Sequence, residues 1–343
     1  MLLIIIPVLT NAQVTENDIA IFSVRGPVLS MHETAYEVIE EDGAIRKGKL
    51  TNKGLSVDGL HFLNYLVMFN KQGSVILSEN YRNEKLIDSI VYTYDSSNNL
   101  VKREKYGIDN NSNLVLFEEQ FSQYNVNGNL IEKMTIEVSD SILTKTVLRY
   151  DNRNNCIEEN VFSNSNPNHT YPNLDIVSKH IRKYNLKGNI IKMKYYDTYF
   201  KLRKEVFRYN HQGQLTKRRM NICRRKGGKS TTRYSYNEKG GLIETTVHDK
   251  GSDKWKKDQY DYDESGNITL HFSNSFKNVE TTLTYKYDSL GNKTCKTVVS
   301  DKHDVYIIKE SIYEYDTAKN WTKRIDFIDG KATLIIEREF TYY

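Results

Sequence analysis

The densest group of charged side chains in this 343-residue sequence lies between residues 217 and 229. Seven cations fall there, around the pair Gly227 and Gly228. Guanidinium and ammonium groups bind phosphate and sulfate through charge-assisted hydrogen bonds. The stretch therefore predicts an anion-binding site for such groups on a lipid or glycan, with a solvated hairpin tip as the alternative. Its candidate ligands are Arg218, Arg219, Arg224, Arg225 and Lys226.

Motifs for nucleophilic or metal-dependent catalysis are missing from the sequence. It has no G-x-S-x-G and no H-E-x-x-H, and its eight histidines follow no regular spacing. The three cysteines, Cys156, Cys223 and Cys295, lack the C-x-x-C spacing of a zinc site, and a disulfide between two of them stays open. We therefore predict a non-enzymatic protein with no catalytic residues, no metal site and no cofactor.

Polar residues recur at turn positions, where calcium binding is one chemistry to consider. The pattern is Tyr-[Asp/Asn]-x-x-[Gly/Asn]-[Asn]-[Leu/Ile]. Asp and Asn accept hydrogen bonds from backbone N–H groups two residues on, and Gly or Asn tolerates positive φ. Asn replaces Asp in half of the copies and lowers the ligand charge, so the pattern favours structural Asx-turns over calcium sites. The turn-defining residues are Asp95, Asn125, Gly128, Asn185, Gly188, Asn210, Gly213, Asn237, Gly240, Asp263, Gly266, Asp288, Gly291 and Asp316.

These turns follow aromatic anchors that recur along the chain at intervals of 25 to 34 residues. The anchors are Phe69, Tyr94, Tyr124, Tyr150, Tyr184, Tyr209, Tyr236, Tyr262, Tyr287 and Tyr315. A repeat of about 26 residues holds two strands and two turns. Aromatic–polar alternation before the anchors puts the aromatic rings on one sheet face, and helical spacing is absent apart from a short stretch near residues 57–69. The sequence predicts an all-β fold of tandem β-hairpin repeats that form a wide, twisted or spiralling antiparallel sheet.

The ends and the composition suggest an exported protein. Residues 1–12 have the short apolar core and small residues of a signal peptide, residues 13–38 form an N-terminal segment, and residues 39–343 form the repeat domain. No segment has the length and apolar character of a transmembrane helix. The net charge of +5 comes from 49 basic and 44 acidic groups that are interspersed, so no nucleic acid partner is expected. We expect the protein to be secreted, periplasmic or at the cell surface.

The turn motif resembles that of the YD-repeat, or rearrangement-hotspot (RHS), family of exported bacterial proteins. Its clearest copies are at residues 260–268 and 285–292, and the resemblance extends from about residue 39 to the C-terminus. It implies β-hairpins that spiral into a shell able to enclose a toxin domain, while shorter members are described as surface or sugar-binding proteins. This chain has longer units and no toxin domain after them, so it resembles a short exported member.

Two functions are compatible with this pattern. The first is a non-enzymatic repeat protein that presents a curved sheet to glycans or proteins of the cell envelope or extracellular space, with tyrosine rings stacking on sugars. The alternative is a shell or scaffold that wraps a polypeptide partner. The repeated tyrosines also have a purely structural explanation, because cross-strand aromatic pairs stabilise sheets.

Overall fold

The protein is all-β in the part of the chain that the structure describes. The computed structural model describes residues 22–51, 55–56, 59–60, 64–138, 141–164, 174–197, 202–222, 228–250, 254–275, 279–301 and 305–343. Within these ranges, 23 strands belong to one antiparallel hydrogen-bonded sheet, and β3 (Leu55–Ser56) and β4 (Gly59–Leu60) form a separate ladder. The predicted all-β antiparallel class is confirmed. The proposed signal peptide, residues 1–12, lies outside the described residues.

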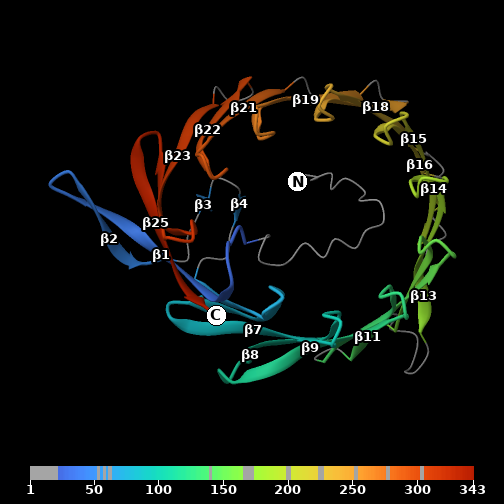
Figure 1. Ribbon diagram of the computed structural model, residues 1–343, viewed down its shortest axis with the longest axis horizontal. Coiled ribbons are helices and arrows are strands. Elements are labelled where there is room, and N and C mark those ends of the chain that lie inside the picture. The colour runs from blue at the N-terminus through green and yellow to red at the C-terminus, as the bar shows by residue number, and fades with distance from the viewer. Residues whose placement is uncertain are drawn as a thin grey trace. The chain divides into compact units, whose positions relative to one another are not determined.

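The chain divides into two compact units. Figure 1 labels strands of both units and colours them by residue number. The strands of unit 1, which holds residues 120–257, are β10 (Leu130–Glu137), β11 (Ile142–Tyr150), β12 (Cys156–Ser163), β13 (Asp175–Tyr184), β14 (Ile190–Asp197), β15 (Arg203–Tyr209), β16 (Leu215–Ile222), β17 (Lys229–Tyr236) and β18 (Leu242–Lys250). The strands of unit 2 are β1 (Val28–Glu41), β2 (Ala44–Leu50), β5 (Tyr65–Phe69), β6 (Val75–Arg82), β7 (Lys85–Tyr94), β8 (Leu100–Ile108), β20 (Ile268–Asn274), β21 (Glu280–Tyr287), β22 (Lys293–Ser300), β23 (Val305–Tyr315), β24 (Trp321–Ile328) and β25 (Lys331–Tyr342), together with β3 and β4. β9 (Leu114–Tyr124) and β19 (Lys254–Tyr262) have residues in both units.

Unit 1 is a meander in which each strand from β10 to β18 pairs with the next one along the chain. The register shifts by one residue just before an anchor, for example between Arg149 and Tyr150 and between Arg208 and Tyr209. Residues directly opposite each other share a face, so this register fixes which side chains lie together.

Unit 2 is organised around β1, a 14-residue strand. One edge of β1 pairs with β25 and the other pairs with β5 and then β2, so strands about 300 residues apart in sequence are neighbours. Most of β1 falls in residues 13–38, which the sequence separated from the repeats. β5 itself lies in the stretch near residues 57–69 whose spacing resembled a helix, and it is a strand.

The apolar core of unit 2 lies against β1. One cluster contains Val28, Met31, Val67 and Phe69, all fully buried. A second cluster places Ala35 of β1 against residues of β24 and β25, namely Trp321, Leu334 and Ile336. Burial of these apolar side chains gives unit 2 a hydrophobic stabilisation that is small in unit 1, where few apolar side chains are buried.

A buried ion pair joins β1 to β25. Arg338 Nε donates to Glu33 Oε2 at 2.8 Å, and both side chains are at most 10% exposed. The Arg338 guanidinium also lies 3.7 Å from the centre of the Trp321 ring, which favours the cation. The Tyr65 hydroxyl donates to the same carboxylate at 3.2 Å, so the buried charges are well satisfied.

We expect Arg338→Ala to lower the free energy of unfolding by about 3–5 kcal/mol, because it leaves the Glu33 carboxylate buried without its cation. Urea denaturation at pH 7 measures this change. The matched control is Arg46→Ala, which removes an ion pair with Glu41 whose side chains are 63% and 57% exposed. The control should cost about 0.5 kcal/mol or less. Equal losses in the two variants would contradict this role for the buried pair.

Candidate functional site

The repeated turns have one hydrogen-bond geometry. At Asp95, Oδ1 accepts from the N–H groups of Ser97 and Asn99 at 2.9 and 2.8 Å, and the Asn98 N–H donates to the Asp95 carbonyl at 3.0 Å. Asn99 Nδ2 donates to Asp95 Oδ2, which uses the second carboxylate oxygen within the same turn. Asn98 has a φ of 60°, as a type I turn followed by a left-handed residue requires. Both oxygens of the Asp95 carboxylate thus accept hydrogen bonds within their own turn.

A further copy of this turn was missed in the sequence. Asp109 Oδ1 accepts from the N–H groups of Asn111 and Asn113, both at 2.8 Å, and Ser112 has a φ of 64°. Ile108 precedes this turn in place of an aromatic anchor, so the anchor pattern did not reveal it.

Asn residues at the left-handed position also do more than tolerate positive φ. Asn154 Oδ1 accepts from Asn127 Nδ2 at 3.0 Å and links neighbouring turns.

The anchor tyrosines connect successive repeats through their hydroxyl groups. The Tyr209 hydroxyl donates to the Ile190 carbonyl at 2.8 Å, and Tyr94, Tyr150, Tyr184, Tyr236 and Tyr287 each donate to the carbonyl at the corresponding position, six residues after the preceding anchor. We call this contact the hydroxyl link. None of the anchors is more than half-exposed, and through the hydroxyl link the rings have a structural role.

We expect Tyr209→Phe to destabilise the protein by about 1 kcal/mol at pH 7, because it removes one hydroxyl link. Burial raises the pKa of Tyr209 to about 12, above its ordinary value of 10.0. Stability from this phenol is therefore complete below pH 10 and is lost as the pH rises from 10 through 12. Urea denaturation between pH 7 and 12 should show a shallower alkaline loss in the variant. The control is Tyr306→Phe, at a tyrosine that is 63% exposed. It should change neither the free energy of unfolding at pH 7 nor its loss at alkaline pH.

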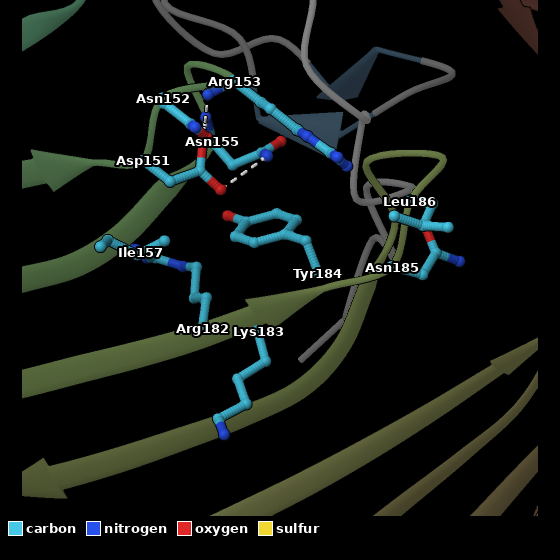
Figure 2. Close-up of a pocket in the computed structure, with 10 residues that line it drawn as sticks. All are labelled: Asp151, Asn152, Arg153, Asn155, Ile157, Arg182, Lys183, Tyr184, Asn185 and Leu186. Atoms are coloured by element: carbon cyan, nitrogen blue, oxygen red, sulfur yellow. Dashed lines mark hydrogen bonds between the residues drawn. The ribbon is translucent and has the colours of Figure 1, made fainter.

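A notch lies between two successive turns of unit 1, with a volume of about 670 Å³. It is lined by Asp151, Asn152, Arg153, Asn155, Ile157, Arg182, Lys183, Tyr184, Asn185 and Leu186. Figure 2 shows the Tyr184 ring between the turn that contains Asp151 and the turn that contains Asn185. Hydrogen bonds, chiefly from the Asn155 side chain, lower the pKa of Asp151, so its carboxylate is ionised and engaged in its own turn. The notch thus offers three cationic side chains, amide groups and an aromatic ring.

The same place in a repeat of unit 2 forms a second notch, of about 410 Å³. Tyr94 takes the position of Tyr184 there, Ile76 that of Ile157, and Asn70 that of Asp151. Tyr92 stands at the position of Arg182, so the two notches differ in charge. The turns that form them have the same backbone hydrogen bonds. The repeat therefore creates a recurring recess whose lining varies from copy to copy.

Ionisable side chains gather beside the unit 1 notch, on the sheet face that carries the anchors. His180 Nδ1 lies 3.3 Å from Glu159 Oε2, and Arg182 donates to the same oxygen. The hydrogen bond from His180 and that from Arg182 outweigh burial and lower the pKa of Glu159 to about 2. Burial raises the pKa of the neighbouring Cys156 thiol, and Arg182 Nη1 lies 3.3 Å from its sulfur. A raised pKa disfavours the thiolate that nucleophilic chemistry needs.

The Glu159 cluster should make unit 1 acid-sensitive. The pKa of this carboxyl in the folded protein is about 2, below its ordinary 4.5, so its stabilisation is complete above pH 4.5 and is lost as the pH falls toward 2. Glu159→Gln should be on the order of 2–3 kcal/mol less stable than the parent at pH 7 and nearly equal to it at pH 2. Urea denaturation across this range measures the difference. A difference that does not change with pH would rule out the ionised carboxylate as its source.

The predicted anion ligands do not form one cluster. Arg218 and Arg219 are adjacent on β16, so their side chains lie on opposite faces of the sheet. Arg218 Nε donates to the buried Glu205 at 2.6 Å, whereas Arg219 is exposed and stands opposite Val206 and Thr231. Arg224, Arg225 and Lys226 lie outside the described residues.

Metal ligands and thiols give no further site in the described ranges. No three His, Cys, Asp or Glu side chains in those ranges are placed to hold a metal ion together. Cys156 and Cys295 carry free thiols, and Cys223 is outside the described residues. No helix in the same ranges has the length and apolar character needed to cross a bilayer.

Fold and site together define an all-β antiparallel protein with a recurring hairpin turn and a recurring notch. No known protein family matches the sequence, and no curated protein matches it. Membership of the YD-repeat family therefore stays a prediction.

Several solved structures match this chain at low similarity. The crystal structure of TcdB2-TccC3-Cdc42 matches 89% of this chain with a TM-score of 0.34 and 12% identity, and this chain spans 18% of that one. The Photorhabdus luminescens Tc holotoxin pore matches 90% of this chain and 17% of its own, with a TM-score of 0.32 and 12% identity. A porin-like protein from Bacteroides uniformis matches 92% of this chain and 98% of its own, with a TM-score of 0.30 and 11% identity. Similarities this low carry no statement about function.

Proposed function

We propose that the protein is an exported, non-enzymatic binding protein that holds glycans of the cell envelope or extracellular space in the notches between its turns. The observation that carries this proposal is the recurrence of one notch in two repeats with different linings. A repeated recess with a constant backbone and variable side chains suits a ligand that is itself built from repeated units.

The chemistry of the notch suits sugars. Saccharide binding sites combine an aromatic ring, against which the apolar face of a sugar packs, with polar groups that orient its hydroxyls. Tyr184 supplies the ring, and Asn152 and Arg153 supply exposed donors at its rim. The Tyr184 hydroxyl is held by the Cys156 carbonyl at 2.7 Å, which fixes the ring in place before a ligand arrives.

Retention of the full-length chain on immobilised neutral and acidic surface polysaccharides, and on envelope extract, tests the proposal. We expect saturable retention on at least one polysaccharide. Asn152→Ala combined with Arg153→Ala should weaken it at least tenfold, which corresponds to about 1.4 kcal/mol. Neither side chain takes part in the hydrogen bonds of its turn, so the double variant should fold normally.

The matched control is Glu238→Ala combined with Lys239→Ala, which alters the same two exposed turn positions after the anchor Tyr236. This pair should leave retention on the polysaccharide unchanged. Retention of one envelope protein and of no polysaccharide would overturn the glycan proposal and support the alternative, a scaffold that wraps a polypeptide.

A further inference from the structure

The face of unit 1 opposite the anchors carries an unusual concentration of positive charge, which we call the basic face. The register of β13 to β18 places ten cationic side chains on it. They are Lys183, Lys192, Lys194, Lys204, Arg208, Lys217, Arg219, Lys229, Arg233 and Lys250. All ten are exposed or half-exposed, and they come from six neighbouring strands. At a strand spacing of about 4.8 Å, the basic face is about 24 Å wide.

The cations of the basic face stand directly opposite one another. The cross-strand pairs are Lys183 with Lys192, Lys194 with Lys204, Arg208 with Lys217, Lys217 with Arg233, and Lys229 with Lys250. Like charges in directly opposite positions destabilise a sheet. Mutual repulsion is also visible in the ionisation of individual groups. Lys204 and Lys194 lower the pKa of Lys192, and Arg219 and Arg233 lower that of Lys217.

The flanks of the same face show how the sheet otherwise neutralises its charges. Lys145 lies 2.8 Å from Glu132, Lys179 lies 2.9 Å from Glu158, and Lys257 lies 3.0 Å from Glu244. Within the part of the chain that the structure describes, none of the ten cations of the basic face takes part in an ion pair. The repulsion is thus confined to one region, where an external anion would relieve it.

We propose that the basic face binds a linear polysaccharide that carries sulfate or carboxylate groups, lying across β13 to β18. Seven of the ten cations are lysines, which bind anions as point charges without a fixed geometry and so tolerate an irregular array of acidic groups. Other positions on this face carry Ile181, Tyr196, Val206, Asn221, Thr231, Thr246 and His248. Successive bases of single-stranded nucleic acid stack on neighbouring aromatic rings, whereas the rings on this face, Tyr196 of β14 and His248 of β18, are four strands apart.

The basic face is independent of the saccharide contacts proposed for the notch, although Lys183 borders both. Its variants can therefore leave Asn152, Arg153 and Tyr184 untouched. Failure of notch variants to weaken retention would count against the notch alone. Failure of the variants described next would count against the basic face alone.

Lys192→Glu combined with Arg233→Glu tests the proposal. Each substitution replaces a like-charge pair by an opposite-charge pair, so thermal unfolding should show unchanged or higher stability. Binding of the full-length chain to fluorescent heparin, which carries sulfate and carboxylate, and to hyaluronate, which carries carboxylate only, is measured by anisotropy as a function of salt. We expect saturable binding to at least one of the two, an affinity at least tenfold lower in the variant, and a shallower salt dependence because fewer counterions are released.

The control for total charge is Lys85→Glu combined with Lys331→Glu, at two exposed lysines of unit 2 that lie outside the basic face. It changes the net charge by the same amount and should keep the affinity within about twofold of the parent, since salt screens exposed charges that lie outside the binding face. An equal loss in the control would show that net charge alone attracts the ligand. Oligothymidylate bound as tightly as heparin, or no saturable binding to either polysaccharide, would also overturn the proposal.

Discussion

The contact on which the rest of this structure depends is the hydrogen bonding of the first turn residue to the two N–H groups that follow it. At Asp95 and its counterparts this side chain fixes a type I turn with a left-handed residue, and the bulge that accompanies the turn fixes the register of each hairpin. Side chains alternate between the faces of a strand, so a slip of one residue would exchange the faces. The separation of the anchors from the basic face follows from the turns.

The two units are stabilised in different ways. Unit 2 has an apolar core around β1, with Phe69 and Met31 fully buried, and a buried ion pair next to it. Apart from Phe207 and Tyr234, the buried side chains described for unit 1 are polar, and they include Glu205 and Asn155. Hydroxyl links, turn hydrogen bonds and cross-strand ion pairs take the place of a core there. A sheet held together in this way needs little apolar burial and keeps both faces polar.

Local features of the fold were predictable from the sequence because their causes lie within a few residues. The hydrogen bonds of the turns join residues two to four positions apart, so the residue types at fixed positions of the motif predict them. The hydroxyl link was not predictable, since the Tyr209 hydroxyl and the Ile190 carbonyl are 19 residues apart and backbone carbonyls carry no sequence signal. The sequence predicts one anion-binding site that includes Arg218 and Arg219, because the pattern does not show that β16 extends through both residues. β16 continues to Ile222, and successive side chains of a strand point to opposite faces of the sheet, so Arg218 and Arg219 lie on different faces. The pairing of β1 with β25 has no local pattern at all.

That pairing also determines how the chain must fold. Glu33 and Arg338 are 305 positions apart in sequence. Bringing β1 and β25 together therefore costs the entropy of closing a long loop, and this cost arises before the contacts between the two strands can offset it. The β-hairpins of the repeats have no such delay, because their partners adjoin in sequence. We therefore expect the repeats to form first, while one edge of β1 keeps its unpaired N–H and C=O groups exposed. During that interval the edge is open to pairing with other chains, so the rate at which β25 docks governs how much of the protein escapes aggregation.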